Sequence, residues 1–275
     1  MAAKIHHLNC GTLCPYGGKI VSGEGGWTGA RIVCHCLLVE TADALVLIDT
    51  GMGVGDLRNP YRCLGIPFTA AFRPARDAAD TAVEQVRRLG FAPGDVRHIA
   101  CTHLDLDHAG GLPDFPHADV HTFKPEYEAA IHPSLRDRSR YPSCHFAHRP
   151  HWQTHEVGGD AWFGFESIRV LPTVDPEILM IPLVGHTRGH TAIAVRDGDR
   201  WLLHCGDAYF NHGEVETPPH CPPGLAAFQK LMAHDGKARA ANQERLRELA
   251  RSHGDEVRLF CAHDPVELER ETAES

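Results

Sequence analysis

Residues 102–112, THLDLDHAGGL, gather four potential metal ligands within six positions at the end of an apolar segment. In an extended backbone His103, Asp105 and Asp107 alternate and therefore project to one side. His108 joins them if the backbone turns after Asp107, and the glycines that follow tolerate such a turn. Two imidazoles and two carboxylates suit Zn²⁺ or a similar divalent ion, or two such ions. The alternative is a polar loop in which some of the 21 histidines of the chain cluster by chance.

Four further short motifs stand in the chain: LIDTG at 47–51, VGHTRGHT at 184–191, HCGDA at 204–208 and CAHD at 261–264. Together with residues 103–108 they resemble, in order, the metal-binding segments of the metallo-β-lactamase superfamily, whose signature is His-x-His-x-Asp-His. Each motif alone is a weak signal, but five in family order over most of 275 residues are a strong one. The resemblance implies an α/β fold, an αβ/βα four-layer sandwich in which helices flank two mixed sheets.

The resemblance also implies a dinuclear metal site and a role for each matching residue. The first ion would be held at positions 103, 105 and 186, the second at positions 107, 108 and 263, with residue 207 between them. The implied ligands are His103, Asp105, Asp107, His108, His186, Asp207 and His263. Asp49 would orient a ligand imidazole, and His190 would do the same or contact substrate, because a metal-bound imidazole needs a partner on its other nitrogen. A bridging hydroxide would be the nucleophile, and Asp107 and Asp207 the catalytic carboxylates.

Asp105 departs from the family signature, which has a second histidine at this position. A carboxylate oxygen binds Zn²⁺ at about the distance of an imidazole nitrogen, so Asp105 can still be a ligand, and we predict that it is. A carboxylate is harder and negatively charged, which shifts the preference of the site toward Mn²⁺ or Fe²⁺. The expected cofactors are two divalent ions, Zn²⁺ first, with Mn²⁺ or Fe²⁺ as alternatives.

Within the superfamily the motifs are most similar to those of acyl-homoserine lactonases. The metal loop continues as Asp-His-Ala-Gly-Gly, and His263 is followed by Asp264, as in those enzymes. They use a tyrosine three residues beyond the bridging aspartate to assist the substrate oxygen. Here Tyr209 lies two residues beyond Asp207, and Phe210 stands in the expected place. Tyr209 is therefore a candidate catalytic residue, with a packed aromatic at the strand end as the alternative.

The resemblance favours a hydrolase that opens a lactone or cleaves a carboxylic ester. One alternative is a thioesterase of the glyoxalase II type, whose thiol carrier would need a basic patch such as the arginines at 136, 138, 140 and 149. A phosphoester hydrolase is another, and a catalytically weak protein that binds metal or ligand is the non-enzymatic one. Hydrolysis of β-lactams is the least expected, because the N-terminus does not read as a secretion signal.

The overall composition narrows the partners. The net charge of −9 argues against binding of nucleic acid or an anionic membrane, and no apolar stretch approaches the roughly 20 residues of a membrane span. We therefore expect a cytoplasmic protein that acts on a small molecule, with a homodimer as one possible assembly. In a reducing compartment its ten cysteines would remain thiols rather than form a disulfide framework. A second zinc site from Cys10 and Cys14 with His6 or His7 is a minor alternative.

The order of the expected elements supports one domain over residues 1–275. Alternation and apolar runs predict strands at 32–40, 45–49, 97–101, 178–184, 191–195, 201–205 and 258–261. Helical spacing predicts helices at 77–89, 225–232 and 238–252. Residues 52–76 and 131–163 read as insertions that shape a substrate pocket; the second is rich in histidine, at 132, 145, 148, 151 and 155.

Overall fold

The computed structural model describes residues 4–23, 26–172 and 174–274, and two six-stranded sheets form its centre. The first sheet has the strand order β1-β2-β3-β4-β5-β6. Its strands are β1 (Lys4–Leu13), β2 (Ile32–Glu40), β3 (Leu45–Ile48), β4 (Val96–Ala100), β5 (Asp119–Phe123) and β6 (His151–His155). Strands β1 to β3 are antiparallel, whereas β3 to β6 run parallel, so the sheet is mixed.

The second sheet has the order β12-β11-β10-β9-β8-β7 and is also mixed, because only β11 and β12 are parallel. Its strands are β7 (Asp160–Trp162), β8 (Phe165–Arg169), β9 (Ile178–Pro182), β10 (Thr191–Asp197), β11 (Arg200–His204) and β12 (Val257–Phe260). All seven predicted strands are confirmed, each within one or two residues of its predicted bounds.

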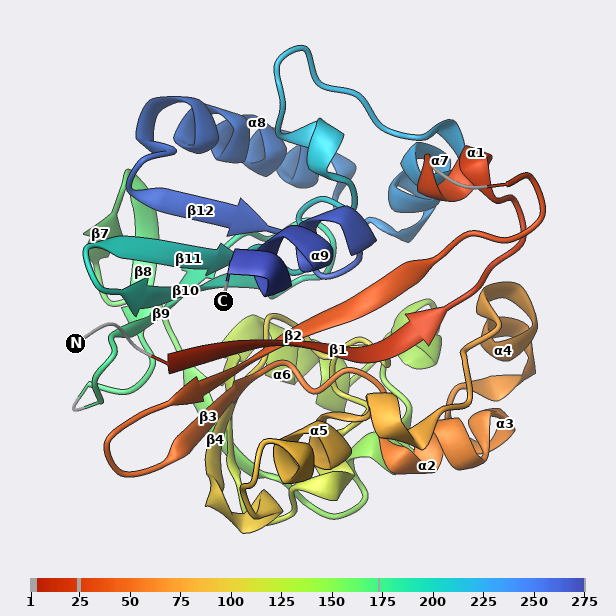
Figure 1. The fold of residues 1–275 in the computed structure, drawn as a ribbon, viewed down its shortest axis with the longest axis horizontal. Helices are drawn as coiled ribbons and strands as arrows, with labels where there is room; N and C mark the ends of the chain where they lie inside the picture. The colour runs from red at the N-terminus through yellow and green to blue at the C-terminus, as the bar shows by residue number, and fades with distance from the viewer. Residues whose placement is uncertain (1–3, 24–25, 173, 275) are drawn as a thin grey trace.

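The two sheets face each other, and helices cover their outer faces, as Figure 1 shows. The helices are α1 (Lys19–Ser22), α2 (Val54–Arg58), α3 (Pro60–Cys63), α4 (Gly65–Phe72), α5 (Ala82–Arg88), α6 (Lys124–Ile131), α7 (Pro223–Met232), α8 (Gly236–His253) and α9 (Pro265–Glu274). Short 3₁₀ turns lie at Ala78–Asp80, Pro93–Asp95, Leu112–Asp114, Asp137–Ser139, Ser143–Phe146 and His212–Glu214. The predicted helix at 77–89 begins late, because Asp77 caps a 3₁₀ turn before α5.

Three buried apolar clusters hold these layers together. The middle cluster joins the sheets and includes Ile48 and Val39 on one side and Met180 and Ile193 on the other. A second lies between the first sheet and helices α5 and α6, and a third between the second sheet and α8. The predicted four-layer αβ/βα sandwich is therefore confirmed. No helix among the described residues is both long and apolar enough to cross a lipid bilayer.

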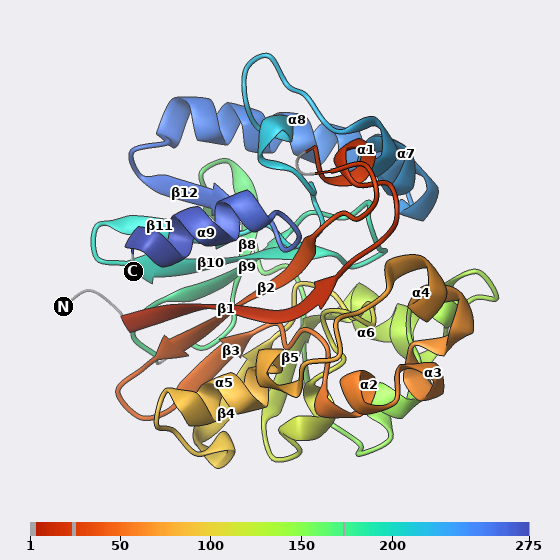
Figure 2. The ribbon, with the colours of Figure 1, turned by 45° about the vertical axis from the view of Figure 1, so that its right-hand side comes forward.

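The first predicted insertion, residues 52–76, folds into α2, α3 and α4, which lie on the same side of the molecule as α1 and α7 (Figure 2). A disulfide ties this insertion to the second one: Cys63, at the end of α3, is bonded to Cys144, 81 residues further along the chain. The expectation of free thiols is wrong for this pair, because Cys63 and Cys144 come together only when the two insertions pack against each other. The eight other cysteines are free, and none of the described groups of potential metal ligands contains Cys10 or Cys14.

Candidate metal centre

The predicted metal ligands lie where strand ends from both sheets meet. Residues 101–108 follow β4, and Asp49 follows the neighbouring parallel strand β3. In the second sheet Asp207 follows β11, and His263 follows the parallel strand β12. His186 lies in the turn between β9 and β10. Because parallel strands end at a common edge, these five segments converge on one point.

The metal loop turns earlier than its sequence suggests. The backbone N–H groups of His108 and Ala109 both donate to the carbonyl oxygen of Asp105, at 3.0 and 2.9 Å. The extended backbone therefore ends at Asp105, and the prediction of a turn after Asp107 is wrong. As a result Asp105 stays beside His103, whereas Asp107 lies on the other side of the site.

One group of potential ligands consists of His103, Asp105 and His186. Asp105 Oδ2 is 3.1 Å from His186 Nε2 and 3.6 Å from His103 Nε2. All three side chains are buried. His103 Nε2 and Asp105 Oδ1 have no hydrogen-bond partner within the described part of the chain, so both are buried polar atoms with capacity for a ligand.

The second group lies around His263. Its Nε2 atom is 3.7 Å from Asp107 Oδ2, and the Nε2 atoms of His108 and His263 are 3.4 Å apart. The thiol of Cys34, a residue that the sequence did not single out, lies within 4.8 Å of ligand atoms of Asp107 and His263.

Asp207 lies between the two groups and faces both. Its Oδ2 atom is 3.3 Å from His186 Nε2 and 3.8 Å from His103 Nε2. Its Oδ1 atom is 3.1 Å from the Nε2 atoms of both His108 and His263. This placement is the one that the predicted bridging role requires.

Two buried residues orient this arrangement from behind. Asp49 accepts from His108 Nδ1 at 2.8 Å and from the backbone N–H of Thr102 at 2.8 Å, so it fixes the ring that faces Asp207. His190 donates from Nδ1 to the carbonyl of Leu183 and accepts from the backbone N–H of Asp207 at 2.9 Å. Both ring nitrogens of His190 are engaged in this way. His190 therefore orients the backbone of Asp207, and it orients neither a ligand imidazole nor a substrate.

Glu126, on α6, is a positioning residue that sequence reasoning missed. Its Oε1 atom accepts from the backbone N–H of Leu104 and from the Tyr141 hydroxyl, both at 3.0 Å. Its Oε2 atom accepts from the Thr187 hydroxyl at 2.6 Å and from the backbone N–H of Gly189 at 3.0 Å. One fully buried carboxylate thus ties the loops that carry His103 and His186. A side chain at Gly189 would collide with the Glu126 backbone, its Cβ lying 2.1 Å from the nitrogen, which explains the glycine of the GHTRGH motif.

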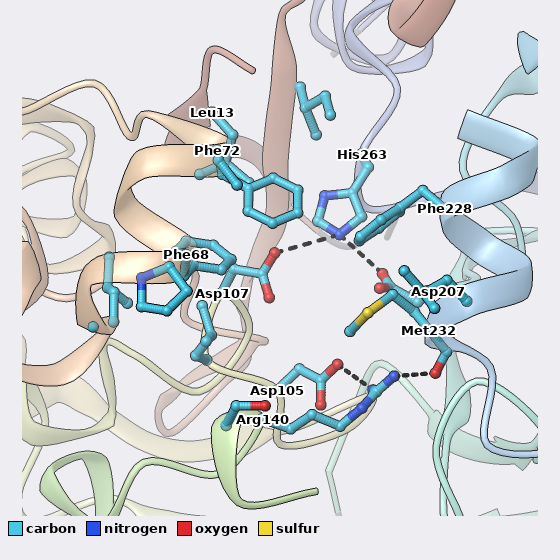
Figure 3. Close-up of a pocket in the computed structure, with 18 of the residues that line it drawn as sticks. Leu13, Phe68, Phe72, Asp105, Asp107, Arg140, Asp207, Phe228, Met232 and His263 are labelled. Atoms are coloured by element: carbon cyan, nitrogen blue, oxygen red, sulfur yellow. Dashed lines mark hydrogen bonds and ion pairs between the residues drawn. The ribbon is translucent and has the colours of Figure 1, made fainter. Parts of the chain in front are cut away.

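Arg140 is the second residue whose position the sequence did not predict. It was expected in an exposed basic patch, but its side chain is buried and its Nη1 atom lies 2.5 Å from Asp105 Oδ2. Nη1 is also 3.2 Å from His186 Nε2, and Nη2 donates to the backbone carbonyl of Met232 (Figure 3).

The charged groups around Asp105 and Asp207 determine whether these two carboxyl groups are ionised. Burial alone would raise the pKa of Asp105, but the Arg140 guanidinium holds it well below its usual range. Burial opposes ionisation of Asp207 in the same way, and the surrounding imidazoles, His263 first, lower its pKa strongly. Both carboxylates are therefore charged acceptors at neutral pH, the form in which carboxylates bind metal ions.

A cavity of about 660 Å³ opens onto these ligands. Its floor carries Asp105, Asp107, His186, Asp207 and His263, and its walls are mainly apolar. The walls come from α4, α7 and neighbouring segments, with Leu13, Phe68, Phe72, Phe210, Leu225, Phe228 and Leu231 among them. Figure 3 shows aromatic rings around the carboxylates of Asp107 and Asp207.

Tyr209 does not reach this cavity. It is fully buried, and its hydroxyl donates to Glu267 Oε1 at 3.0 Å, in the core between the second sheet and α8. The neighbouring Phe210 lines the cavity instead. The placement removes Tyr209 from the proposed catalytic residues and agrees with the alternative of a packed aromatic.

The residues present fit divalent metal ions. Nitrogen and carboxylate oxygen ligands of the expected types converge, and buried atoms such as His103 Nε2 and Asp105 Oδ1 lack partners among the described residues. Such unpaired buried groups are costly unless an ion or a water meets them.

The fold and the converging ligands define a metal-dependent hydrolase of the metallo-beta-lactamase superfamily. The family model matches residues 29–263, and the chain belongs to this superfamily.

The chain is similar to several known hydrolases, some of them named lactonases. The chain is 42% identical over 273 residues to a "probable metallo-hydrolase" of Mycobacterium tuberculosis, covering 98% of this chain and 84% of that protein. It is 28% identical over 221 residues to the N-acyl homoserine lactonase AttM of Rhizobium johnstonii, covering 78% and 81%. The structure of a B. thuringiensis AiiA variant with N-decanoyl-L-homoserine bound at its active site superposes with a TM-score of 0.73 at 22% identity, covering 98% and 97% of the two chains. The first relative agrees with membership of a metallo-hydrolase family, and the likeness to the AiiA structure shows the same fold.

Proposed function

We propose that the protein opens a lactone or cleaves a carboxylic ester at a dinuclear metal centre. The observation that carries the proposal is the position of Asp207, which faces two groups of ligands at the floor of an apolar cavity. The lactonases among its relatives support the substrate class.

His103, Asp105 and His186 would hold one ion, and Asp107, His108 and His263 the other, with Asp207 shared between them. Zn²⁺ is the first choice, and Mn²⁺ or Fe²⁺ the alternatives that the Asp105 carboxylate favours. Ions bound in this way polarise a carbonyl oxygen and make water nucleophilic at neutral pH.

The chain's own side chains supply the remaining requirements. Asp107 faces the cavity and is the more exposed of the two catalytic carboxylates, so its oxygens can accept a proton and pass it to a leaving alkoxide. The aromatic walls exclude water and bind the alkyl part of the substrate. Asp49 fixes the ring of His108, and His190 fixes the backbone of Asp207.

The arginines bear on the thioesterase alternative. Arg140 is committed to Asp105, and Arg136 donates to the carbonyls of Leu231 and Ala233. Arg136, Arg138 and Arg149 are exposed, and because Arg136 is engaged by these carbonyls, only Arg138 and Arg149 of the predicted basic patch are fully available to an anionic carrier. This distribution favours a lactone or simple ester over a thioester of a charged thiol.

The test is a panel of a lactone, a carboxylic ester, a thioester, a phosphodiester and a β-lactam, assayed with protein loaded with Zn²⁺, Mn²⁺ or Fe²⁺. We expect turnover of the lactone or ester, its loss on chelation, and its loss in Asp207→Ala together with bound metal. Turnover confined to the thioester or phosphodiester, or wild-type activity in Asp207→Ala, would refute the proposal.

A further inference from the structure

We propose that Arg140 is the counter-charge of Asp105, and that the two residues act as one unit in place of the family's second histidine. This inference rests on the proposed metal centre. It concerns ion binding, however, and can be tested without a substrate.

The contacts single out Arg140 among the arginines near the cavity. Its guanidinium is buried at the floor, 2.5 Å from Asp105 Oδ2. The backbone carbonyl of Met232, the last residue of α7, accepts from its other terminal nitrogen. The guanidinium is therefore held between the metal loop and α7 and cannot turn to solvent without breaking a buried interaction.

The pairing fixes the carboxylate that faces the ligand imidazoles. Asp105 Oδ2 lies 3.1 Å from His186 Nε2 and 3.6 Å from His103 Nε2 and also contacts Arg140, whereas Oδ1 has no hydrogen-bond partner in the described residues. A guanidinium that fixes one oxygen of a carboxylate also fixes the direction of the other. Arg140 thereby orients Asp105 as hydrogen-bonded partners orient ligand imidazoles.

The charges balance only when both residues are counted. A neutral imidazole at position 105 contributes no charge, and Asp105 with Arg140 also contributes none. Either residue alone would leave a full charge in a buried site, where it strongly affects a divalent ion a few ångströms away. An unpaired Arg140 repels the ion, and an unpaired Asp105 attracts it.

This balance reverses what position 105 alone would lead one to expect. By ligand type, Asp105→His restores the family's signature and should retain the ion with a shift toward Zn²⁺. With Arg140 in place, the same change leaves a buried guanidinium facing imidazoles, 3.2 Å from His186 Nε2. We therefore expect the return to histidine to succeed only when Arg140 is neutralised as well.

The experiment compares wild type, Asp105→His, Arg140→Gln, the double variant Asp105→His/Arg140→Gln, and the control Arg138→Gln. Arg138 lines the same cavity but is exposed, so this control makes the same charge change two residues away. Zn²⁺ and Mn²⁺ affinities are measured by competition with a chromophoric chelator. The ion assigned to Asp107, His108 and His263 serves as the internal reference.

For the first ion we expect Asp105→His to lose about 30-fold or more in affinity and the double variant to return to within about threefold of wild type for Zn²⁺. Arg140→Gln should bind about tenfold more tightly, and Arg138→Gln should bind as wild type. Equal affinity in Asp105→His and the double variant, or an effect of Arg138→Gln as large as that of Arg140→Gln, would overturn the proposal.

A second comparison covers the case in which Asp105→His does not fold. Arg140→Lys keeps the charge, so it should bind like wild type while Arg140→Gln binds more tightly; identical affinities would overturn the proposal. A protein that follows this pattern but hydrolyses neither lactone nor ester would refute only the proposed function.

Discussion

The ring of Phe210 lies almost parallel to the imidazole of His263, with centroids 5.1 Å apart and 21° between the planes. Phe210 also contacts Phe228 edge to face, with centroids 6.0 Å apart. A metal-ligand candidate and an apolar wall of the cavity are thus in direct contact.

Phe210→Ala should raise KM for an ester with a long alkyl chain by roughly tenfold, because it removes an aromatic wall. Steady-state kinetics on a short-chain and a long-chain ester measure this, and Phe210→Leu is the control that keeps an apolar wall. An equal change in KM for both esters would show that the ring does not contact the alkyl chain.

Tyr209→Phe should leave kcat and KM within about twofold of wild type and lower the free energy of unfolding by roughly 1–2 kcal/mol. The variant removes only the hydroxyl that donates to Glu267 in the core. Chemical denaturation and ester kinetics test the two parts separately. A hundredfold loss of kcat in a stable protein would return Tyr209 to the active site.

The Glu267 carboxyl should make stability fall as the pH rises from about 4.5 to about 7. Burial raises its pKa to about 7; Asp264 adds to the rise, while the Cys261 N–H and Arg270 oppose it. In this window the folded protein holds a proton that the unfolded chain has lost, so the stabilisation is complete below pH 4.5 and disappears through pH 7.

Glu267→Gln should therefore flatten this part of the profile, by up to about 3 kcal/mol. Urea denaturation at a series of pH values is the measurement, with Glu269→Gln, an exposed position on the same helix, as control. Parallel profiles for wild type and Glu267→Gln would contradict the assignment.

The arrangement of the site was predictable only where it depended on local sequence. The five motifs placed seven ligand candidates at strand ends, because runs such as Leu45–Ile48 and Val96–Ala100 carry clear strand patterns. Arg140 and Glu126 meet the metal loop from 35 and 22 residues further along the chain, and nothing near them in sequence marks that contact. The turn that begins at Asp105 was not predicted, because the glycines at 110 and 111 indicated a turn after Asp107 instead.

Glu126→Gln should lower the free energy of unfolding by about 1–3 kcal/mol and weaken binding of the first ion. An amide replaces one acceptor oxygen by a donor. That donor then faces either the Leu104 N–H and the Tyr141 hydroxyl or the Gly189 N–H and the Thr187 hydroxyl. Denaturation and metal titration are compared with Glu128→Gln, which lies exposed on the same helix. Equal effects of the two substitutions would contradict the positioning role.

The disulfide should be detectable as a deficit of thiols. Titration of the denatured, unreduced protein should find eight thiols rather than ten. The double variant Cys63→Ser/Cys144→Ser should lose roughly 2–4 kcal/mol of stability, because the bond closes a long loop. Ten thiols in protein isolated under oxidising conditions would show that the pair does not form, in line with the reducing compartment expected from the sequence.

Most of the apolar walls of the cavity come from α4 and α7, outside the segments that carry the ligand candidates. Residues such as Leu64, Phe68, Phe72, Leu225 and Phe228 shape the walls without belonging to the ligand groups, and one link between the two is the Met232 carbonyl that accepts from Arg140. A substitution at Met232 leaves its backbone carbonyl in the chain. Combinatorial libraries at the wall positions can therefore alter substrate range in directed evolution while the ion-binding residues remain unchanged.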